Sequence, residues 1–261
     1  MRARSLVAGA VAIAAVAAAG LAALPASADQ SGPVKPLIVG GKPSPEPYSF
    51  MVSLQNNGRH FCGGSLISPE WVITAAHCVE GASKIQLRIG SLQHASGGEE
   101  AESAEIIPHP DYNGSSPGGD IALVKLAAAA KSAPVAMAGK ADPGTQSRII
   151  GWGQTTPEPG GSAPDDLQEL DTQVLDANKC TGIDGSVELC TDNPNGDSGA
   201  CYGDSGGPQV AKEGEGWTLI GATSRSGNGD STCATGPSIY TSVPAYADWI
   251  KQNTGGSVTV R

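Results

Sequence analysis

The sequence predicts an all-β fold, a barrel or a sandwich built from many short strands. Glycine and proline are frequent, at 36 and 19 of 261 residues, and they interrupt the chain at short intervals. Between them lie short segments rich in Val, Ile and Leu, among them 50–54, 85–89 and 218–222. Short apolar runs bounded by turn residues are typical of strands, and a chain dominated by them is typical of the all-β class.

One segment near the C-terminus predicts a helix instead. In residues 243–253 the side chains of Tyr246, Trp249 and Ile250 recur at positions i, i+3 and i+4. That spacing places them on one face of an α-helix. We therefore expect a helix that closes the chain after the last strand.

The N-terminal segment has the pattern of an export signal. Arg2 and Arg4 precede an apolar stretch, residues 6–24, and small residues follow up to Ala28. This order predicts a signal peptide, residues 1–28. The alternative is a membrane anchor, because the stretch is longer than a usual signal core. Its alanines and glycines partition weakly into lipid, so we expect a secreted, extracellular protein that is not attached to a membrane after cleavage.

The rest of the chain carries a strong negative charge. Residues 1–37 contain three basic residues and one acidic residue, so the formal charge changes from −10 for the whole chain to −12 without them. Binding to nucleic acid needs a basic surface that displaces counterions from phosphate, so we expect no nucleic-acid partner. A charge of this size mainly favours solubility.

Six cysteines in an exported chain predict a disulfide framework, for which sequence alone allows fifteen connectivities. Pairing of sequence neighbours suggests three bonds: Cys62 with Cys78, Cys180 with Cys190, and Cys201 with Cys233. Free thiols or a zinc site are the alternative, but no C-x-x-C pair or downstream histidine supports zinc. We expect no metal and no cofactor.

Three motifs contain the residue types of a nucleophilic catalyst. They are TAAHC around His77, GGDIALVKL around Asp120 and GDSGGP around Ser205. A serine hydroxyl is a weak nucleophile at neutral pH, so acyl transfer needs an imidazole to take its proton and a carboxylate to hold the imidazole in one tautomer. These three residues are the candidate catalytic set.

The order of the set along the chain excludes two unrelated architectures. All four histidines precede Ser205, whereas the G-x-S-x-G elbow of α/β-hydrolases, which residues 203–207 also match, needs its histidine after the serine. A subtilisin-like order needs an aspartate before the histidine. The one aspartate before His77 is Asp29, in a segment predicted to be removed. The order His, Asp, Ser remains.

With these motifs the chain resembles the chymotrypsin/trypsin family of serine proteases. The matching segments are IVGG from Ile38, CGGSLISPEWVITAAHC from Cys62, DIALVKL from Asp120, GWG from Gly151, GDSGGP from Gly203 and IYTSV from Ile239. The resemblance implies two packed six-stranded antiparallel β-barrels, residues 38–146 and 147–261, with a C-terminal α-helix and an active site between the barrels. It also implies the three disulfide pairs, and the alanine-rich leader with a short propeptide is similar to bacterial members.

By this resemblance Ser205 attacks a peptide carbonyl, His77 accepts its proton, and Asp120 stabilises the imidazolium, through an acyl-enzyme intermediate. The backbone N–H groups of Gly203 and Ser205 would form the oxyanion hole. The implied activity is that of a serine endopeptidase acting on protein or peptide substrates.

The resemblance also implies a zymogen. Cleavage before Ile38 would release a propeptide, residues 29–37, and the new ammonium group of Ile38 would pair with Asp204 and form the oxyanion loop. The residue before this site is Leu37, where the trypsin pattern has Arg or Lys. We therefore expect an activating protease that accepts leucine, with the enzyme itself as one candidate.

The family places the base of the substrate pocket six residues before the nucleophile, which is Gly199 in this chain. Trypsin-like members have an aspartate there, so Arg and Lys side chains would lose their partner. The other predicted pocket residues are Ala200, Ser224, Arg225, Ser226 and Ser238. An uncharged, narrowed pocket favours medium apolar side chains. The alternatives are an acidic side chain bound by the hydroxyls of Thr223, Ser226 and Ser238 close to Arg225, and a basic one bound by Asp197.

The remaining signals are weaker. The acidic residues from Glu99 to Glu105 occupy the loop where some relatives bind calcium, but a clear set of alternating oxygen ligands is missing, which favours a solvated acidic turn.

We expect a monomer, with proteinaceous inhibitors as further partners. Two functions compete with the peptidase. One is a catalytically silent protease-like binding module, against which the complete catalytic set argues; the other is an esterase, which the histidine order disfavours.

Overall fold

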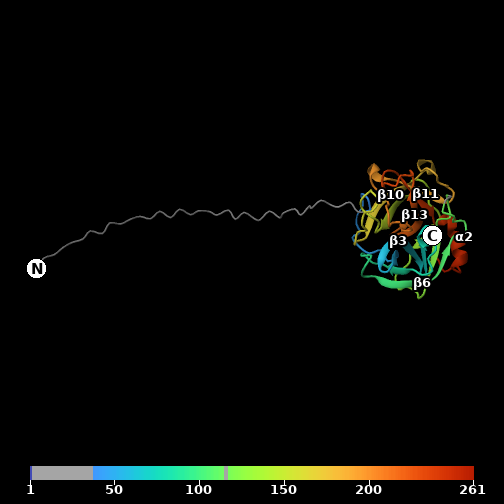
Figure 1. Ribbon diagram of the computed structural model, residues 1–261, viewed down its shortest axis with the longest axis horizontal. Coiled ribbons are helices and arrows are strands. Elements are labelled where there is room, and N and C mark those ends of the chain that lie inside the picture. The colour runs from blue at the N-terminus through green and yellow to red at the C-terminus, as the bar shows by residue number, and fades with distance from the viewer. Residues whose placement is uncertain (2–37, 115–116) are drawn as a thin grey trace. The chain divides into compact units, whose positions relative to one another are not determined.

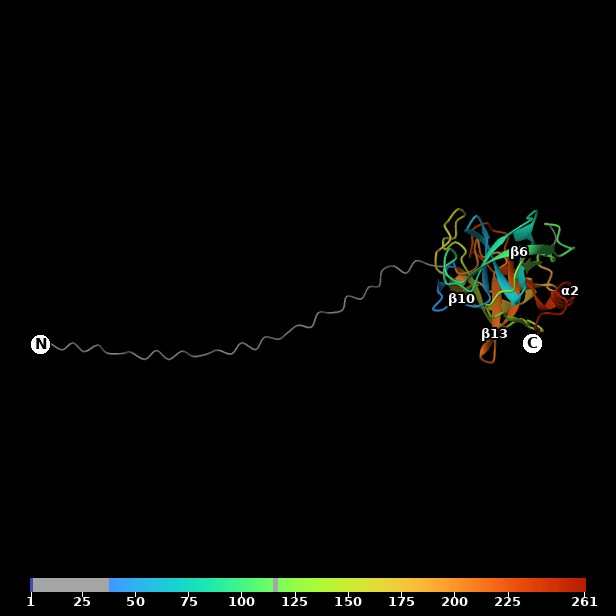
Figure 2. The same cartoon turned by 90° about the horizontal axis from the view of Figure 1, so that it is seen from below.

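Two closed antiparallel β-barrels of six strands each form the fold (Figures 1 and 2). The computed structural model describes Met1, residues 38–114 and residues 117–261. The predicted signal peptide and propeptide lie outside the described residues, apart from Met1. The fold class predicted from the sequence is confirmed.

The first barrel closes in the order β2-β3-β4-β7-β6-β5. Its strands are β2 (Met51–Asn56), β3 (Arg59–Ser68), β4 (Trp71–Thr74), β5 (Gln86–Ile89), β6 (Glu99–Pro108) and β7 (Ala122–Leu126). Two of the predicted strand segments, 50–54 and 85–89, correspond to β2 and β5, which pair with each other.

The second barrel repeats this order as β9-β10-β11-β14-β13-β12. Its strands are β9 (Gln146–Gly151), β10 (Gln168–Leu175), β11 (Glu188–Thr191), β12 (Pro208–Glu213), β13 (Gly216–Ser226) and β14 (Ser238–Ser242). The predicted segment 218–222 lies within β13. Two short strands that precede β9 in the chain also pair with this barrel: β1 (Lys42–Pro43) with β10, and β8 (Ala136–Met137) with β13.

Apolar side chains fill both barrels and the contact between them. One buried cluster contains Leu54 and Leu123 of the first barrel together with Trp152, Val210 and Leu219 of the second half. In β2 the residues from Met51 to Gln55 are all buried, although successive side chains of a strand point to opposite faces. Both faces of this strand are therefore covered, and its two buried polar side chains, Ser53 and Gln55, are hydrogen-bonded. This cluster spans both barrels and holds the segments between them at fixed positions, while a separate buried cluster lies in the second barrel.

Helices are short and lie outside the barrels. The predicted C-terminal helix is present as a 3₁₀ turn, η3 (Pro244–Tyr246), continued by α2 (Ala247–Asn253). Ile250 is fully buried, as its place on the apolar face requires. The other helical turns are α1 (Ala76–Val79), η1 (Ala177–Lys179) and η2 (Pro194–Gly196). None of the helices in the described ranges is long and apolar enough to cross a membrane.

Three disulfides join Cys62 to Cys78, Cys180 to Cys190, and Cys201 to Cys233. The first connects β3 to the helical turn α1, and the third connects the segment before residue 205 to the loop before β14. Both bonds therefore hold segments that carry residues of the candidate catalytic set or lie beside them.

Candidate active site

Asp120 is a buried carboxylate two residues before β7, with 8% of its surface exposed. The hydroxyl of Ser224 donates to its Oδ2 at 2.6 Å, and the hydroxyl of Thr241 donates to its backbone carbonyl at 2.8 Å. Burial alone would raise the pKa of Asp120, but hydrogen bonds and charge from His77, together with the Ser224 hydroxyl, lower it overall. The carboxylate is thus held ionised in one orientation.

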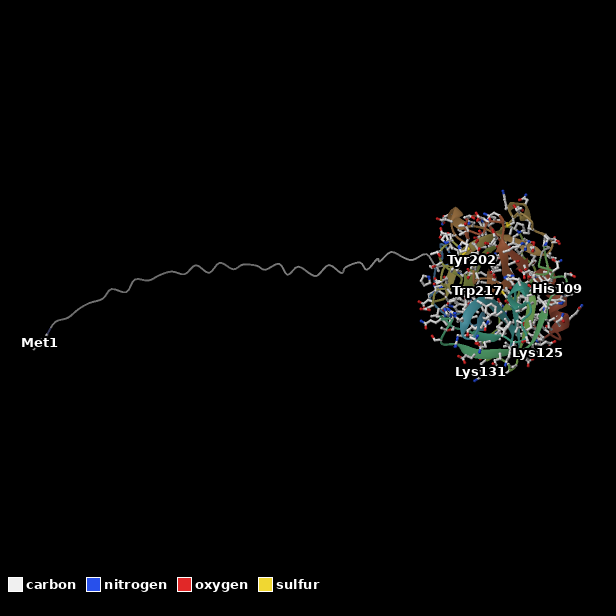
Figure 3. All side chains as sticks on the ribbon, viewed as in Figure 1. Met1, His109, Lys125, Lys131, Tyr202 and Trp217 are labelled. Carbon is white, nitrogen blue, oxygen red and sulfur yellow. A yellow bond between two sulfur atoms is a disulfide. The ribbon has the colours of Figure 1, made fainter. Side chains whose placement is uncertain are left out.

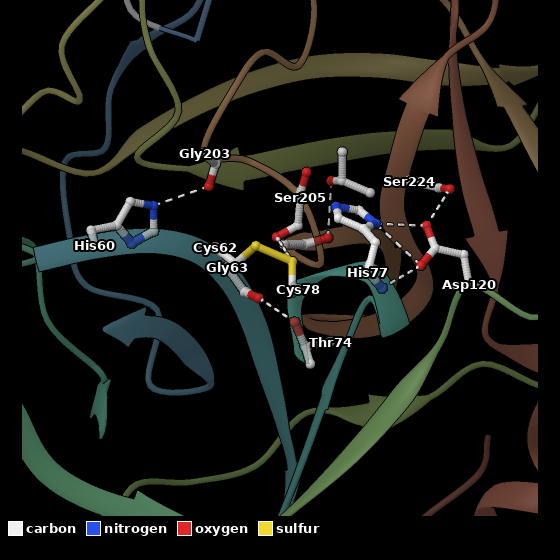
Figure 4. Close-up of a disulfide and its surroundings, with 12 residues drawn as sticks. His60, Cys62, Gly63, Thr74, His77, Cys78, Asp120, Gly203, Ser205 and Ser224 are labelled. Carbon is white, nitrogen blue, oxygen red and sulfur yellow. Dashed lines mark hydrogen bonds and ion pairs between the residues drawn. A yellow bond between two sulfur atoms is a disulfide. The ribbon is translucent and has the colours of Figure 1, made fainter. Parts of the chain in front are cut away.

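His77 lies in α1, directly after β4, and faces this carboxylate. Its ring Nδ1 is 2.9 Å from Asp120 Oδ2, and its backbone N–H donates to Oδ1 at 3.0 Å. Because the carboxylate can only accept, Nδ1 carries the hydrogen, and Nε2 is left as the basic nitrogen. In Figure 4 the imidazole of His77 lies between Asp120 and Ser205.

Ser205 sits in a turn that is bonded to both barrels. Its carbonyl accepts from the backbone N–H of Gly63 in β3 at 2.8 Å, and the next residue, Gly206, donates to the carbonyl of Thr223 in β13 at 2.8 Å. The neighbouring disulfide from Cys62 to Cys78 ties β3 to the turn that carries His77 (Figure 4). Strand β3 therefore connects the backbone of Ser205, through a hydrogen bond, to the turn that carries His77, through the disulfide.

Gly203, two residues earlier, has a φ of 98°, a conformation that favours glycine. Its carbonyl accepts a hydrogen bond from His60 Nε2 at 3.0 Å, and the Ser53 hydroxyl contacts the other ring nitrogen of His60 at 2.9 Å. Burial lowers the pKa of His60 to about 4, so the ring is neutral at pH 7. Among the described residues, no backbone carbonyl accepts a hydrogen bond from the N–H of Gly203 or of Ser205.

Asp204, next to the nucleophile candidate, is also buried. Its carboxylate accepts from the backbone N–H groups of Gly153 at 2.8 Å and Cys201 at 2.9 Å. A Cβ at residue 153 would lie 2.2 Å from this carboxylate, so the GWG motif needs its second glycine for space. Within the described ranges no cation pairs with Asp204, and burial raises its pKa to about 6.

Ile38 begins the described part of the domain in an unusual conformation. It is 1% exposed and packs in the core of the second barrel. The carbonyl of the next residue, Val39, accepts a hydrogen bond from the backbone N–H of Gly199 at 2.8 Å. The φ of Ile38 is 38°, a region that is unfavourable for a β-branched residue.

A cavity of about 280 Å³ opens beside Ser205. Five of the six predicted pocket residues line it, namely Ala200, Ser224, Arg225, Ser226 and Ser238. The sixth, Gly199, is buried next to it, since a Cβ there would lie 3.7 Å from the Ser238 hydroxyl. Asp197 is exposed and does not line the cavity, whereas Asp230, in the loop after β13, does.

The charges of this cavity differ from the sequence expectation. The guanidinium of Arg225 is bound by the carboxylate of Glu188, whose side chain is fully buried. Asp230 lies exposed at the rim and accepts a hydrogen bond from the backbone N–H of Thr232. Sequence reasoning missed Glu188 and Asp230 because no local motif marks their places beside the site.

The structure offers no suitable metal ligands near the site in the part of the chain that it describes. His77, Cys62 and Cys78 lie close together, but the two sulfurs form a disulfide and are not thiolates. The acidic residues from Glu99 to Glu105 lie in strand β6 and not in the solvated turn expected from the sequence; Glu99 accepts from two backbone N–H groups, and Glu100 and Glu102 pair with Arg88 and Lys84. These acidic side chains already have partners.

Proteins similar to this chain are serine proteases. The sequence model of the Trypsin family matches residues 38–250. Serine protease 1 of Rattus norvegicus is 40% identical over 229 residues, 82% of this chain and 88% of the relative. Trypsin of Sus scrofa is 39% identical over 218 residues, 78% of this chain and 89% of the relative. Among solved structures, neuropsin, a serine protease expressed in the limbic system of mouse brain, has a TM-score of 0.73 and 32% identity, and covers 83% of this chain and 100% of its own.

Proposed function

The chain belongs to the trypsin family of serine proteases and is a serine endopeptidase, and we propose that it cleaves peptide bonds with His77, Asp120 and Ser205 as its triad. Ser205 attacks the carbonyl carbon while His77 Nε2 takes the hydroxyl proton and then gives it to the leaving amine. Asp120 stabilises the imidazolium that forms in between. The observation that carries this proposal is the imidazole of His77, bonded to Asp120 on one side with Ser205 on the other (Figure 4).

The tetrahedral intermediate needs donors for its oxyanion, and we assign them to the backbone N–H groups of Gly203 and Ser205. Two features support this assignment. Both N–H groups lack a backbone acceptor among the described residues, and His60 holds the carbonyl of Gly203 in place. Removal of one such donor typically costs about a hundred- to a thousandfold in kcat.

Labelling with a fluorophosphonate tests the triad directly. We expect stoichiometric labelling of the mature protein at Ser205, because the reagent needs an activated serine. The Ser205→Ala variant serves as the control and should remain unlabelled. A folded wild-type protein that does not react would contradict the triad and favour a silent binding module.

We further propose that the enzyme is activated by cleavage before Ile38. The buried carboxylate of Asp204 has two backbone donors but no cation among the described residues, and a new ammonium group at Ile38 would supply one. Cleavage would also remove the strained φ of Ile38, because no carbonyl would then precede its nitrogen. Leu37 and the rest of the predicted propeptide lie outside the described residues.

This proposal predicts different pH dependence for the two forms. In the uncleaved chain Asp204 has a pKa of about 6, above its ordinary value of 3.8. The fold therefore favours its neutral form, and about 3 kcal/mol of stability is lost as pH rises through 4 to 6. In the form that begins at Ile38 the ammonium favours the charged carboxylate, so this loss should disappear.

Urea unfolding at pH 4 and pH 7 measures the difference. The Ser205→Ala background prevents self-cleavage, and an added Asp204→Asn substitution isolates the contribution of this carboxyl group. In the uncleaved form, the free energy of unfolding of Ser205→Ala should fall from pH 4 to pH 7 relative to that of Ser205→Ala with Asp204→Asn. In the form that begins at Ile38, this relative loss should be absent. The same trend in both forms would contradict pairing between Ile38 and Asp204.

For specificity we propose that the enzyme prefers uncharged, medium apolar side chains before the scissile bond. Gly199 carries no charge, and the cation of Arg225 is bound by Glu188 and is not free for an acidic substrate. Asp230 at the rim is the feature that supports the basic alternative.

A cleavage profile on a peptide library tests this preference. We expect cleavage mainly after apolar residues, and Asp230→Asn should leave the profile unchanged. Cleavage mainly after Arg or Lys, reduced at least tenfold by Asp230→Asn, would reverse the assignment. Asp197→Asn is the matched control because Asp197 is exposed and outside the cavity.

The processing and environment of the enzyme remain part of the proposal. We infer a secreted, extracellular monomer made with a signal peptide, residues 1–28, and a propeptide, residues 29–37. The mature protein would consist of two barrel units, residues 38–146 and 147–261, and would act on proteins or peptides and be open to proteinaceous inhibitors. The relatives compared above are mammalian, so a bacterial type stays a prediction of the leader sequence.

A further inference from the structure

Arg225 and Glu188 form an ion pair close to Asp120, in which the carboxylate is buried and the guanidinium is partly exposed. Arg225 Nη1 is 2.6 Å from Glu188 Oε1, and Nη2 is 3.0 Å from Oε2, which gives a two-pronged contact. The Glu188 side chain is 0% exposed and that of Arg225 is 35% exposed. A bidentate geometry with a desolvated carboxylate is the strong form of such a pair.

The pair is also bonded to the segment that precedes Asp120. Glu188 Oε1 accepts from the backbone N–H of Gly118 at 2.9 Å. Its Oε2 accepts from the N–H of Asp184 at 2.9 Å, and Arg225 Nη2 donates to the carbonyl of Gly182 at 2.7 Å. One ion pair thus holds the start of the Asp120 turn, the loop before β11 and the end of β13.

A single hydroxyl connects this pair to the triad. Ser224 lies at a register shift between Thr223 and Arg225 in β13, and a bulge of this kind re-aims a side chain. Its hydroxyl donates to Asp120 Oδ2 at 2.6 Å and lies 3.4 Å from Arg225 Nη1. The guanidinium and the catalytic carboxylate therefore contact the same oxygen atom.

We propose that Arg225 and Glu188 are positioning residues for Asp120, and that their opposite charges cancel in their electrostatic effect on the triad. Arg225 keeps the Ser224 hydroxyl directed at Asp120, and Glu188 holds Gly118 while it neutralises the cation. The inference rests on the proposed triad. Without Glu188, the positive charge of Arg225 would disfavour the His77 imidazolium that Asp120 must stabilise. Without Arg225, the negative charge of Glu188 would favour the imidazolium before His77 has taken the proton of Ser205.

Other ionisable groups face the pair from each neighbouring segment. Tyr246 carries no charge at neutral pH, and its hydroxyl accepts from the N–H of Gly119 at 2.6 Å. The carboxylate of Asp184 is turned to Ser186. His77 and Asp120 lie beyond Ser224. Of these groups, the triad pair is the one linked to Arg225 through a side-chain hydroxyl.

The pH profile of kcat/KM tests the proposal, because its acid limb follows protonation of the general base. Arg225→Gln should move the acid limb to higher pH, and Glu188→Gln should move it to lower pH, each by roughly half a unit or more for a charge at this distance. The double variant Arg225→Gln with Glu188→Gln should return the limb toward that of the wild type. Arg225→Lys keeps the charge without the planar fork and should leave the limb in place.

A second buried pair in the same barrel provides the matched control. Glu169, with a side chain 1% exposed, pairs with Arg148 at 3.0 Å and binds Tyr48 rather than the triad. Glu169→Gln and Arg148→Gln should leave the acid limb unmoved. Acid limbs that stay at the wild-type position in both single Arg225 and Glu188 variants, or that move in the same direction, would overturn the proposal. Fluorophosphonate labelling of Ser205 in the wild type separates this result from a failure of the triad itself.

Discussion

Replacing Ser205 by alanine is expected to lower kcat about a millionfold. The side chain is the proposed nucleophile, and without it His77 has no hydroxyl to deprotonate. Residual hydrolysis, from the oxyanion donors and substrate binding alone, should remain roughly a thousand- to ten-thousandfold above the uncatalysed reaction. Single-turnover assays on a good peptide substrate, with the protein beginning at Ile38, measure the loss.

Addition of His77→Ala to this variant provides the internal control. Residues that act as one unit are not additive, so the double variant should be nearly as active as Ser205→Ala alone. A further large drop in the double variant would show that His77 contributes independently of Ser205. That result would contradict their roles as nucleophile and general base.

Replacing Asp120 by asparagine is expected to lower kcat about ten-thousandfold at neutral pH. The amide can still accept at one atom, but its NH₂ group would face a donor from His77 or Ser224, both of which now bind the carboxylate. The imidazole would then be held in the wrong tautomer, with its basic nitrogen turned away from Ser205. Steady-state kinetics from pH 6 to 9 measure this loss.

The carboxylate of Asp120 does not change its protonation state in the pH range of this assay. Its pKa lies below the ordinary 3.8, so it stabilises the folded state above that value and loses this contribution only as pH falls below it. The wild-type carboxylate is thus fully ionised throughout the assay range. Asp197→Asn, an exposed control near the same cavity, should keep full activity. Activity of Asp120→Asn within tenfold of the wild type would contradict the orienting role.

Much of the fold could be predicted because its signals are local. Short apolar runs correspond to β2, β5 and β13, and the spacing of Tyr246, Trp249 and Ile250 predicts the C-terminal helix that the structure contains. The pairing of β1 and β8 with strands of the second barrel could not be predicted in this way. Two-residue strands have no periodicity of their own, and their pairing depends on where the chain passes after both barrels have closed.

In the candidate site, too, local motifs could be predicted and contacts between strands could not. His77, Asp120 and Ser205 each sit in a contiguous motif, and their chemistry requires those residue types, so sequence alone nominated them and excluded the competing orders. Ser224 was predicted as a pocket wall, and the bulge in β13 directs its hydroxyl to Asp120 as well. No run of residues encodes that direction, because it depends on the register between β13 and β14.

By itself the sequence determined which atoms are available for chemistry and the order in which the chain presents them. The tertiary structure decided their electrostatic surroundings: Glu188 binds Arg225, His60 holds Gly203, and Asp204 is buried beside two glycines. Each of these contacts joins segments from different strands or different barrels. The free energy of a buried charge depends on every group within a few ångströms, and those neighbours are assembled only when both barrels have closed.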